Sequence, residues 1–219
     1  MSTVLNCMEE AERLRGIGLA AASVRAGNLV VFPTDTVYGI GADAFNNAAV
    51  AEILKAKHRG PDYPVAVLVG SWNTIQGLVS SYNSQMKLLV EAFWPGGLSL
   101  VVPQAPSLPW NLGDTRGTVM LRMPNHPIAL QLLREVGPMA VSSANIHGHP
   151  PAIRVTEAQH QLGEAVDIYL DGGDAVIGQP STIVDLSSGD PRILREGATS
   201  AAEIARVLDI SPESLLAER

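Results

Sequence analysis

The sequence predicts an α/β fold of the mixed α+β type, with helices packed on an open, twisted, mostly parallel mixed sheet. Amphipathic helical segments and short buried strands alternate along the chain, which is the pattern of a sheet covered by helices. The alternation is irregular, because several strands follow one another without a helix between them. This irregularity favours a mixed sheet over a regular doubly wound one.

The chain length and composition indicate one domain. The 219 residues are 46% hydrophobic, which is enough to fill the core of a single large domain. No segment has the composition of a linker. We therefore expect one domain over about residues 8–208, followed by a C-terminal tail over 209–219.

Each predicted helix has apolar residues at helical spacing and a recognisable end signal. The first spans about 8–25, with Leu14, Ile17, Ala21 and Val24 on one face and Gly27 as its C-terminal cap. Four more helices are predicted over about 47–57 (capped by Asn46 or Asn47), 84–93, 127–135 (with Pro127 in its first turn) and 200–208 (with a Ser200–Glu203 capping box).

Strands are predicted where a short apolar run lies between glycine, proline or polar turn residues. These runs are 29–32, 65–69, 98–102, 118–123, 139–143, 166–170, 181–186 and 192–195.

Composition excludes several classes of function. The 15 Lys and Arg residues against 22 Asp and Glu give a net charge of −7, which argues against a protein that coats nucleic acid. The single cysteine, Cys7, excludes an intramolecular disulfide and a four-cysteine zinc site. The N-terminus lacks the basic start of a secretory signal, and the apolar runs are too short to span a bilayer. We expect a soluble cytoplasmic protein with no membrane partner.

Common nucleotide and metal motifs are missing. There is no P-loop, and Gly39 and Gly41 lack the third glycine of the dinucleotide fingerprint. His147 and His149 have a spacing that suits a metal site, but they lie in a Gly/Pro loop without a third ligand, so a solvated loop is the simpler interpretation. No protein-bound metal is predicted.

Three polar loops directly follow predicted elements and are candidates for a ligand site. They are PTDTVYGIG (33–41), AKHRGPDYP (56–64) and VSSANIHGHPP (141–151). Their hydroxyls, glycines and cations suit an anionic ligand. Each also has a structural interpretation: a strand-to-helix turn with Asp35 as a cap, cations placed against a helix dipole, and an Asx or Ser turn.

Arginines within predicted strands are a further signal. Arg122 lies between Leu121 and Met123, where a cation needs an anionic partner; this partner is either a ligand or a carboxylate such as Asp35 or Asp185. Arg192 and Arg195 are three residues apart on one strand, so only one of them can face the site.

Taken together, these motifs resemble a known family. PTDTVYGIGADA, Lys57–Arg59 with Pro64, FWPGGLSLVVP, TVMLRMPNHP, SSAN and STIVDL…PRILREGA occur in the order found in the YrdC-like family of L-threonylcarbamoyladenylate synthases. The resemblance covers roughly residues 10–205. It implies a twisted mixed sheet around a concave, basic cavity.

The resemblance also implies an activity. Family members combine ATP, L-threonine and bicarbonate into threonylcarbamoyl-AMP and pyrophosphate, and a tRNA threonylcarbamoyl transferase complex then modifies the adenosine next to the anticodon. Any contact with tRNA is expected to be indirect. Mg²⁺ is expected to bridge the ATP phosphates without a protein ligand.

The family's site residues map onto this chain in three groups. The catalytic set corresponds to Lys57, Arg59, Ser143 and Asn145, and the threonine and bicarbonate site to Thr36, Arg122, Val141 and Ser181. The ATP site corresponds to Arg59, Tyr63, Thr118, Ser143, Pro151 and Arg195.

We expect a division of roles within this set. Arg122 binds the threonine carboxylate, while Lys57 and Arg59 hold bicarbonate and the α-phosphate. Thr36 and Ser181 recognise the amino acid. Ser143 and Asn145 fix the phosphate and ribose, and Arg195 contacts the triphosphate.

The chain departs from the family pattern at two positions. Tyr63 stands where many members have Asn, and Leu68 where many have His. The competing interpretations are a double-stranded RNA-binding protein of the same fold and a ligand-binding paralogue without synthase activity. A hydrogenase-maturation carbamoyl transferase is a further rival, but its acylphosphatase and zinc-finger segments are absent from this sequence.

Overall fold

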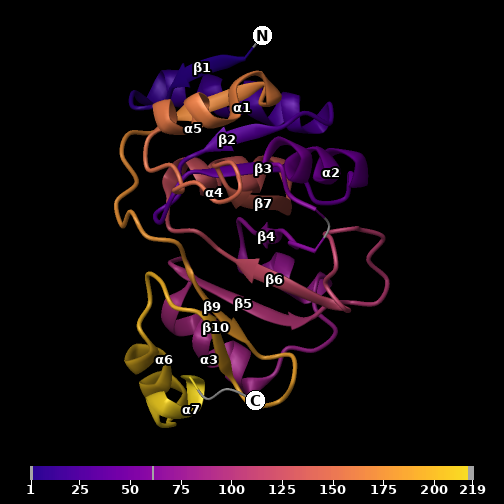
Figure 1. Cartoon of the computed structure of the whole chain (residues 1–219), viewed down its shortest axis with the longest axis vertical. Coiled ribbons are helices and arrows are strands. Elements are labelled where there is room, and N and C mark those ends of the chain that lie inside the picture. The colour runs from indigo at the N-terminus through magenta and orange to yellow at the C-terminus, as the bar shows by residue number, and fades with distance from the viewer. Residues whose placement is uncertain (1, 61, 217–219) are drawn as a thin grey trace.

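The protein is described by a computed structural model over residues 2–60 and 62–216. Ten strands form one sheet in the order β1-β8-β2-β3-β7-β4-β6-β5-β9-β10, which runs along the long axis of the molecule (Figure 1). The strands are β1 Thr3–Asn6, β2 Val30–Phe32, β3 Gly39–Asp43, β4 Ala66–Leu68, β5 Leu98–Pro103, β6 Thr118–Arg122, β7 Met139–Ser143, β8 Ile168–Asp171, β9 Thr182–Asp185 and β10 Arg192–Arg195.

The sheet is mixed, as predicted, but it is not mostly parallel. Four of its nine described strand pairings are parallel and five are antiparallel. The connections β2–β3, β5–β6 and β9–β10 contain no helix, and strands joined in this way pair as antiparallel neighbours. Parallel pairs need a long crossover, which this chain supplies for fewer strands than we expected.

Seven helices accompany the sheet in the described part of the chain. They are α1 Glu10–Arg25, α2 Asn47–Ala56, α3 Ser84–Phe93, α4 Pro127–Val136, α5 Val155–Leu162, α6 Ala201–Leu208 and α7 Pro212–Leu216, with short 3-10 turns at Trp72–Gly77 and Gly163–Ala165. The predicted caps are present: the Asn46 side chain accepts from the Ala49 N–H, and Ser200 and Glu203 form a capping box.

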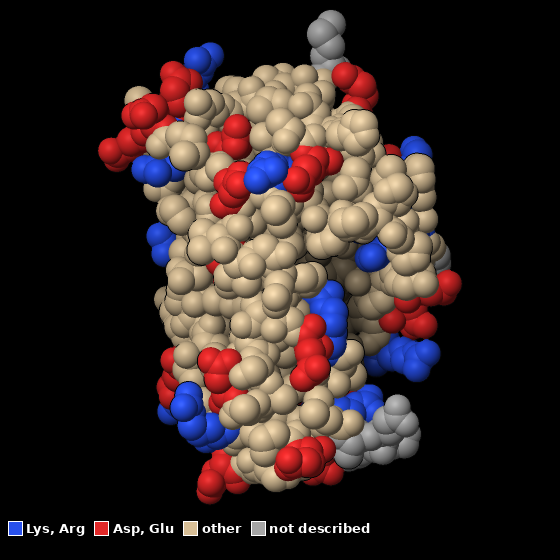
Figure 2. All heavy atoms as spheres, turned by 60° about the vertical axis from the view of Figure 1, so that its left-hand side comes forward, with Lys and Arg blue, Asp and Glu red and all other residues tan. Residues whose placement is uncertain are grey.

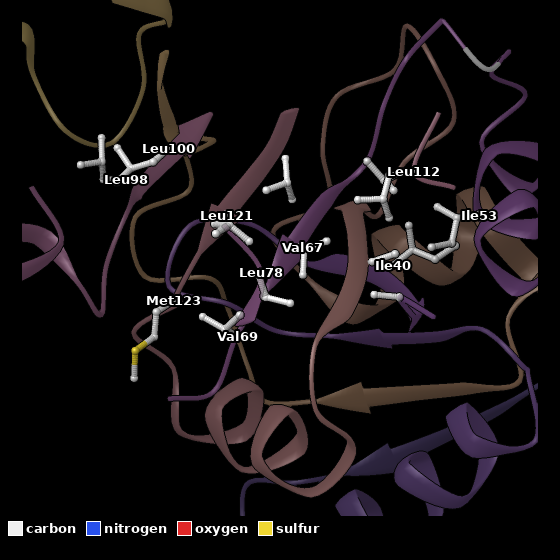
Figure 3. Close-up of a cluster of buried hydrophobic side chains, with 14 of the residues drawn as sticks. Ile40, Ile53, Val67, Val69, Leu78, Leu98, Leu100, Leu112, Leu121 and Met123 are labelled. Carbon is white, nitrogen blue, oxygen red and sulfur yellow. The ribbon is translucent and has the colours of Figure 1, made fainter. Parts of the chain in front are cut away.

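The two faces of the sheet are covered to different extents. One face carries a continuous apolar cluster that includes side chains of α2, α3, α5 and α6, and Figure 3 shows Ile40, Val67, Leu121, Leu100 and Leu98 within it. On the other face, α1 and α4 cover a smaller cluster built from β2, β4, β7 and β8.

The polar residues lie on the uncovered part of the second face. Side chains alternate along each strand, so Leu98 and Leu100 point into the large cluster while Ser99 points the other way. On β6, Leu121 is in the core, and Met120 and Arg122 share the face of Ser99. This alternation brings polar and apolar residues of β5 and β6 to an open cavity.

Most predicted elements are confirmed within one or two residues, including α2, α3, α4, β5, β7 and β10. Leu14 is an exception, because it is 59% exposed near the start of α1, whereas Ile17, Ala21 and Val24 are buried as expected.

Four elements were not predicted: β1, β3, α5 and α7. Strand β3 has the sequence GIGAD, which has little β propensity, but its glycines are required by packing. A Cβ on Gly39 would lie 2.9 Å from Val141 Cγ1, and a Cβ on Gly41 would lie 3.1 Å from Phe32 Cε1.

The ordered fold extends past both predicted domain boundaries. Strand β1 pairs with β8 before residue 8, and α7 packs on α6 and β10 with Leu215 fully buried. The segment predicted as a tail is therefore folded as far as residue 216, and its last three residues lie outside the described part. No helix among the described residues is long and apolar enough to cross a membrane.

Candidate active site

A cavity of about 400 Å³ lies on the open part of the second sheet face, within the range of ligand pockets. It is lined by residues of seven strands, β3, β4, β5, β6, β7, β9 and β10, and of the loops next to them. Figure 2 shows Lys and Arg side chains beside a hollow on the face it draws. The lining residues that the sequence also singled out are Thr36, Arg59, Tyr63, Arg122, Val141, Ser143, Asn145, Pro151, Ser181 and Arg195.

The end of α2 directs Arg59 into this cavity. His58 has a positive φ of 53°, the left-handed conformation that closes many helices. The His58 N–H donates to Lys55 O over 3.0 Å and the Arg59 N–H to Leu54 O over 2.8 Å, which is the pattern of a Schellman motif. The chain thus reverses immediately after Lys57.

Lys57 is fully buried and does not line the cavity. Its Nζ donates to the backbone oxygens of Ser143 and Asn145 and, over 3.4 Å, to Asn145 Oδ1. Burial, together with the charge of Arg59, lowers the pKa of Lys57 to about 7. An ammonium has three donors, and here all three have acceptors within the protein. The expectation that Lys57 contacts bicarbonate or phosphate stays a prediction; in this structure Lys57 joins the end of α2 to the loop after β7.

Asn145 also acts on the loop that contains it. Its Nδ2 donates to the carbonyls of Ile146 and His149, both over 2.9 Å, and its Oδ1 faces Lys57. Asn145 is only 5% exposed although it lines the cavity. Its amide groups hold residues 143–149 in shape, and the Ser143 hydroxyl remains the polar side-chain group that this segment offers to the cavity.

Arg122 is held at the cavity by three acceptors. Its Nε donates to Gly96 O over 2.9 Å, Nη1 to Thr36 Oγ1 over 2.8 Å and Nη2 to Asp35 Oδ1 over 2.5 Å. The sequence left open a carboxylate partner for Arg122, and that partner is Asp35. Because a guanidinium has five N–H donors, one remains on each terminal nitrogen.

Ser181 and Arg195 form a second polar group, at the end of the sheet that contains β9 and β10. Arg195 Nη2 donates to Ser181 O over 2.7 Å and to Ser181 Oγ over 3.2 Å, and Ser181 Oγ lies 2.9 Å from Ser99 Oγ. Arg195 lines the cavity and Arg192 does not, as the spacing on this strand predicted. An irregular register between Ile193 and Arg195 adds a bulge at this point.

The rim of the cavity carries Arg59, Tyr63 and His147. Arg59 Nε donates to His147 Nδ1 over 3.1 Å, and the guanidinium carbon lies 5.3 Å from the centre of the Tyr63 ring. The Tyr63 and His147 rings are themselves in contact, with centroids 4.8 Å apart. Sequence analysis assigned no role to His147; its nearness to Arg59 comes from the fold.

The arginines of the cavity act on one another electrostatically. Burial lowers the pKa of Arg195, and the nearby charge of Arg59 lowers it further. Burial also lowers the pKa of Arg122, with Asp35 opposing and Arg195 adding to that shift. Mutual repulsion of this kind prepares the cavity for an anion, because a bound anion removes it.

Thr118 is the second predicted site residue that does not line the cavity. It lies on the same strand face as Met120 and Arg122, but at the far end of β6, where its hydroxyl donates to Thr115 O over 2.7 Å. Among the lining residues not predicted are Ser99, Met120 and Ile183. The alternation of Ser99 with Leu98 and Leu100, and of Met120 with Leu121, is the signal that would have found two of them.

No group of three or more His, Cys, Asp or Glu residues suitable for a metal ion is found within the described residues. The described lining of the cavity contains no carboxylate, so its donor set is cationic, hydroxyl and amide. Such a set suits phosphate and carboxylate ligands.

Comparison with known proteins agrees with this geometry. The profile of the Sua5/YciO/YrdC family, which carries the description telomere recombination, matches residues 22–197. The chain belongs to this family. A Mycobacterium tuberculosis protein with the provisional name threonylcarbamoyl-AMP synthase is 58% identical over 215 residues, covering 98% of this chain and 99% of the relative. At this identity over nearly the whole of both chains, the chain is an enzyme.

Longer relatives share the same domain. A Pyrococcus abyssi protein named threonylcarbamoyl-AMP synthase is 36% identical, and the match covers 95% of this chain and 61% of the relative. The crystal structure of P. abyssi Sua5 complexed with L-threonine superimposes with a TM-score of 0.91 at 35% identity, over 96% of this chain and 63% of that one. Escherichia coli YciO, at 24% identity and a TM-score of 0.83, shares the fold.

Proposed function

We propose that this enzyme forms L-threonylcarbamoyl-AMP and pyrophosphate from ATP, L-threonine and bicarbonate. The names of the family relatives support the reaction, and the P. abyssi Sua5 complex with L-threonine supports the amino-acid substrate. The observation that carries the proposal is the convergence of Arg59, Arg122 and Arg195 on one cavity from three separate segments.

The chemistry requires positioning more than a protein nucleophile. The threonine amine attacks the carbon of bicarbonate, a C–N bond forms and water leaves, which gives a carbamate. A carbamate oxygen then attacks the α-phosphorus, and the bond to pyrophosphate breaks. Each step brings anions together, so the enzyme gains most by neutralising them and holding them in line.

The threonine end of the site is assigned to Arg122, Thr36 and Ser181. Arg122 keeps one free N–H on each terminal nitrogen, the pair that a carboxylate binds in a bidentate manner. Thr36 Oγ1 accepts from Arg122, and the hydroxyls of Thr36 and Ser181 both belong to nearly buried residues that line the cavity. Such a site distinguishes amino acids by hydrogen bonding to the substrate hydroxyl.

The phosphate end is assigned to Arg59 and Arg195, with Ser143 between them as a hydroxyl donor. Within the described residues, Arg59 donates from its Nε alone, so its terminal nitrogens are available to phosphate oxygens. Mg²⁺ enters the proposal as part of the MgATP substrate, held by phosphates. Lys57 and Asn145 contribute indirectly, by shaping the segment that presents Ser143.

The product is a mixed anhydride of a carbamate and a phosphate, which is an activated acyl donor. A separate transferase must therefore consume it, and we propose the enzyme that places threonylcarbamoyl on tRNA adenosine. The synthase itself needs no tRNA contact for this role.

The decisive experiment is mass spectrometry of the product formed from ATP, bicarbonate and a panel of amino acids. We expect threonylcarbamoyl-AMP with stoichiometric pyrophosphate, and no product when bicarbonate is removed. Arg59→Met serves as the matched inactive control. If the wild-type enzyme gives no carbamoyl adenylate with any amino acid, the proposal is wrong.

Titrations of double-stranded RNA, ATP and threonine binding, run beside this assay, separate the competing interpretations. An RNA-binding protein would show a steep loss of double-stranded RNA affinity with salt and release no pyrophosphate. A ligand-binding paralogue would bind ATP or threonine without turnover. The net charge of −7 opposes autonomous RNA binding.

A further inference from the structure

His147 has no part in the reaction described above, yet it contacts the central cation of the phosphate end. It comes from the loop after β7, whereas Arg59 follows α2, so the contact joins two segments that are 88 residues apart in sequence. The side chain of His147 is exposed at the cavity rim. The Arg59–Tyr63–His147 group is called the rim cluster below.

The backbone fixes the two halves of the rim cluster relative to each other. The His147 N–H donates to Lys57 O over 2.9 Å, so the loop is attached to the C-terminal end of α2. His58, in the left-handed conformation, turns the chain directly after Lys57. Arg59 therefore lies next to His147. The side-chain contact is therefore supported by main-chain hydrogen bonds on both sides.

The hydrogen bond defines the state of the imidazole. Arginine has no acceptor, so His147 Nδ1 must accept from Arg59 Nε and carries no proton. The ring proton of neutral His147 then lies on Nε2. With Nε engaged and the Tyr63 ring covering the guanidinium, rotation of Arg59 about its last bonds is restricted.

We propose that His147 is a positioning residue that orients Arg59 and thereby sets the affinity of the cavity for the polyphosphate of ATP. The identity of the ligand rests on the proposed function, whereas the contact itself rests on the geometry. His147 acts by accepting at Nδ1, which keeps both terminal nitrogens of Arg59 aimed at the ligand. Preorganised donors bind an anion more tightly than donors that must be ordered on binding.

The test compares His147→Ala with His147→Asn, because Asn Oδ1 stands where Nδ1 was and can accept the same hydrogen bond. The dissociation constants of ATP and of inorganic pyrophosphate are measured by calorimetry. We expect His147→Ala to weaken both by about five- to ten-fold, the size of one typical hydrogen bond. His147→Asn should restore both to within about two-fold of wild type.

The matched control is His149→Ala, in the same exposed loop and with no side-chain contact to Arg59; it should bind both ligands as wild type does. Nitrogen-15 NMR of the His147 ring, assigned by its loss in His147→Asn, should show an unprotonated Nδ1. Unchanged binding in His147→Ala, failure of His147→Asn to restore binding, or a protonated Nδ1 in the neutral ring would each overturn the proposal.

Failure of the proposed function is distinguishable from failure of this proposal. If wild type binds ATP and pyrophosphate, shows the His147 pattern and makes no carbamoyl adenylate, the synthase assignment fails and the positioning role stands. If wild type makes the product and His147→Ala binds ATP normally, only the positioning role is lost.

Discussion

Asp35 Oδ1 accepts a hydrogen bond from Arg122 Nη2 over 2.5 Å, between two side chains that each expose less than a tenth of their surface. The same oxygen accepts the Asn125 N–H over 3.0 Å. The Arg122 charge is therefore balanced within the protein before any ligand binds. Since Arg122 also lines the cavity, this buried pair links the stability of the fold to the site.

Asp35→Asn should destabilise the protein strongly. It leaves the Arg122 guanidinium buried without its counter-charge, and removing one partner of a buried pair costs about 3–5 kcal/mol. Urea denaturation measures the free energy of unfolding. The control is Asp174→Asn, whose exposed pair with Arg154 should contribute less than about 1 kcal/mol. If Asp35→Asn lowers the free energy of unfolding no more than the control does, the Asp35–Arg122 pair does not stabilise the fold.

Arg122→Lys should raise the threonine KM by about ten-fold or more, because the three donors of an ammonium cannot replace the five that bind Gly96, Thr36, Asp35 and both oxygens of a carboxylate. The ATP KM should change by less than about two-fold, since Arg122 is assigned to the amino-acid end. Pyrophosphate release measured against each substrate gives both constants. Equal changes in the two KM values would remove Arg122 from the threonine site.

Arg59→Met and Lys57→Met should reduce activity by different routes. Arg59 lies in the cavity, so its loss should lower kcat/KM by about 10²–10³ with little change in stability. Lys57 is buried below the cavity, so its loss removes the Lys57 hydrogen bond from both the Ser143 and the Asn145 carbonyl, although Ser143 O keeps the Asn145 N–H; the loss should lower activity and stability together. Thermal unfolding measured beside turnover separates the two. If the Lys57→Met variant is inactive but as stable as wild type, Lys57 acts directly in catalysis.

The sequence predicted the cavity better than it predicted the roles within it. Ten of the twelve site residues that the family resemblance implied line the cavity. Lys57 was assigned a direct contact because it belongs, with Arg59, to a motif that carries the resemblance. Lys57 is buried and Arg59 lines the cavity because of the way in which α2 ends. The spacing of the two residues in the sequence does not show this difference.

The reason why β3 was not predicted is related. Its glycines look like a loop in sequence, but they allow the close approach of β7, where Val141 and Met139 occupy the space a side chain would fill. Likewise, the pairing of Arg59 with His147 needs two loops to be adjacent, which only the sheet order establishes. Long-range packing is thus the part of the site that local pattern does not contain.

His58→Gly should stabilise the protein by about 0.5–1 kcal/mol. A non-glycine residue in the left-handed region costs about 1–2 kcal/mol, and part of that gain is offset by the greater freedom of glycine in the unfolded chain. The midpoint of thermal unfolding should rise by about 1–4 °C for a chain of this length. Lys55→Gly, inside the same helix, is the control and should destabilise. A decrease for His58→Gly would mean that the His58 side chain itself stabilises the turn.

The buried Lys57 predicts how stability depends on pH. Its pKa falls from 10.5 in the unfolded chain to about 7 in the folded protein, so the cost of burying its charge is fully present below pH 7. Between pH 7 and 10.5 the unfolded chain binds the proton and the folded protein does not, and the free energy of unfolding therefore rises with pH through this range. The size of this pKa shift limits the gain in the free energy of unfolding to at most about 5 kcal/mol. The three acceptors around Nζ reduce the gain, because they favour the charged form.

Urea denaturation of wild type and Lys57→Met at several values between pH 6 and pH 10 tests this dependence. Other groups titrate equally in both proteins, so the difference between the two free energies of unfolding isolates Lys57. Wild type should gain stability relative to Lys57→Met as the pH rises above 7. Parallel curves would mean that Lys57 keeps its proton in the folded protein, and that its three carbonyl and amide acceptors outweigh its burial.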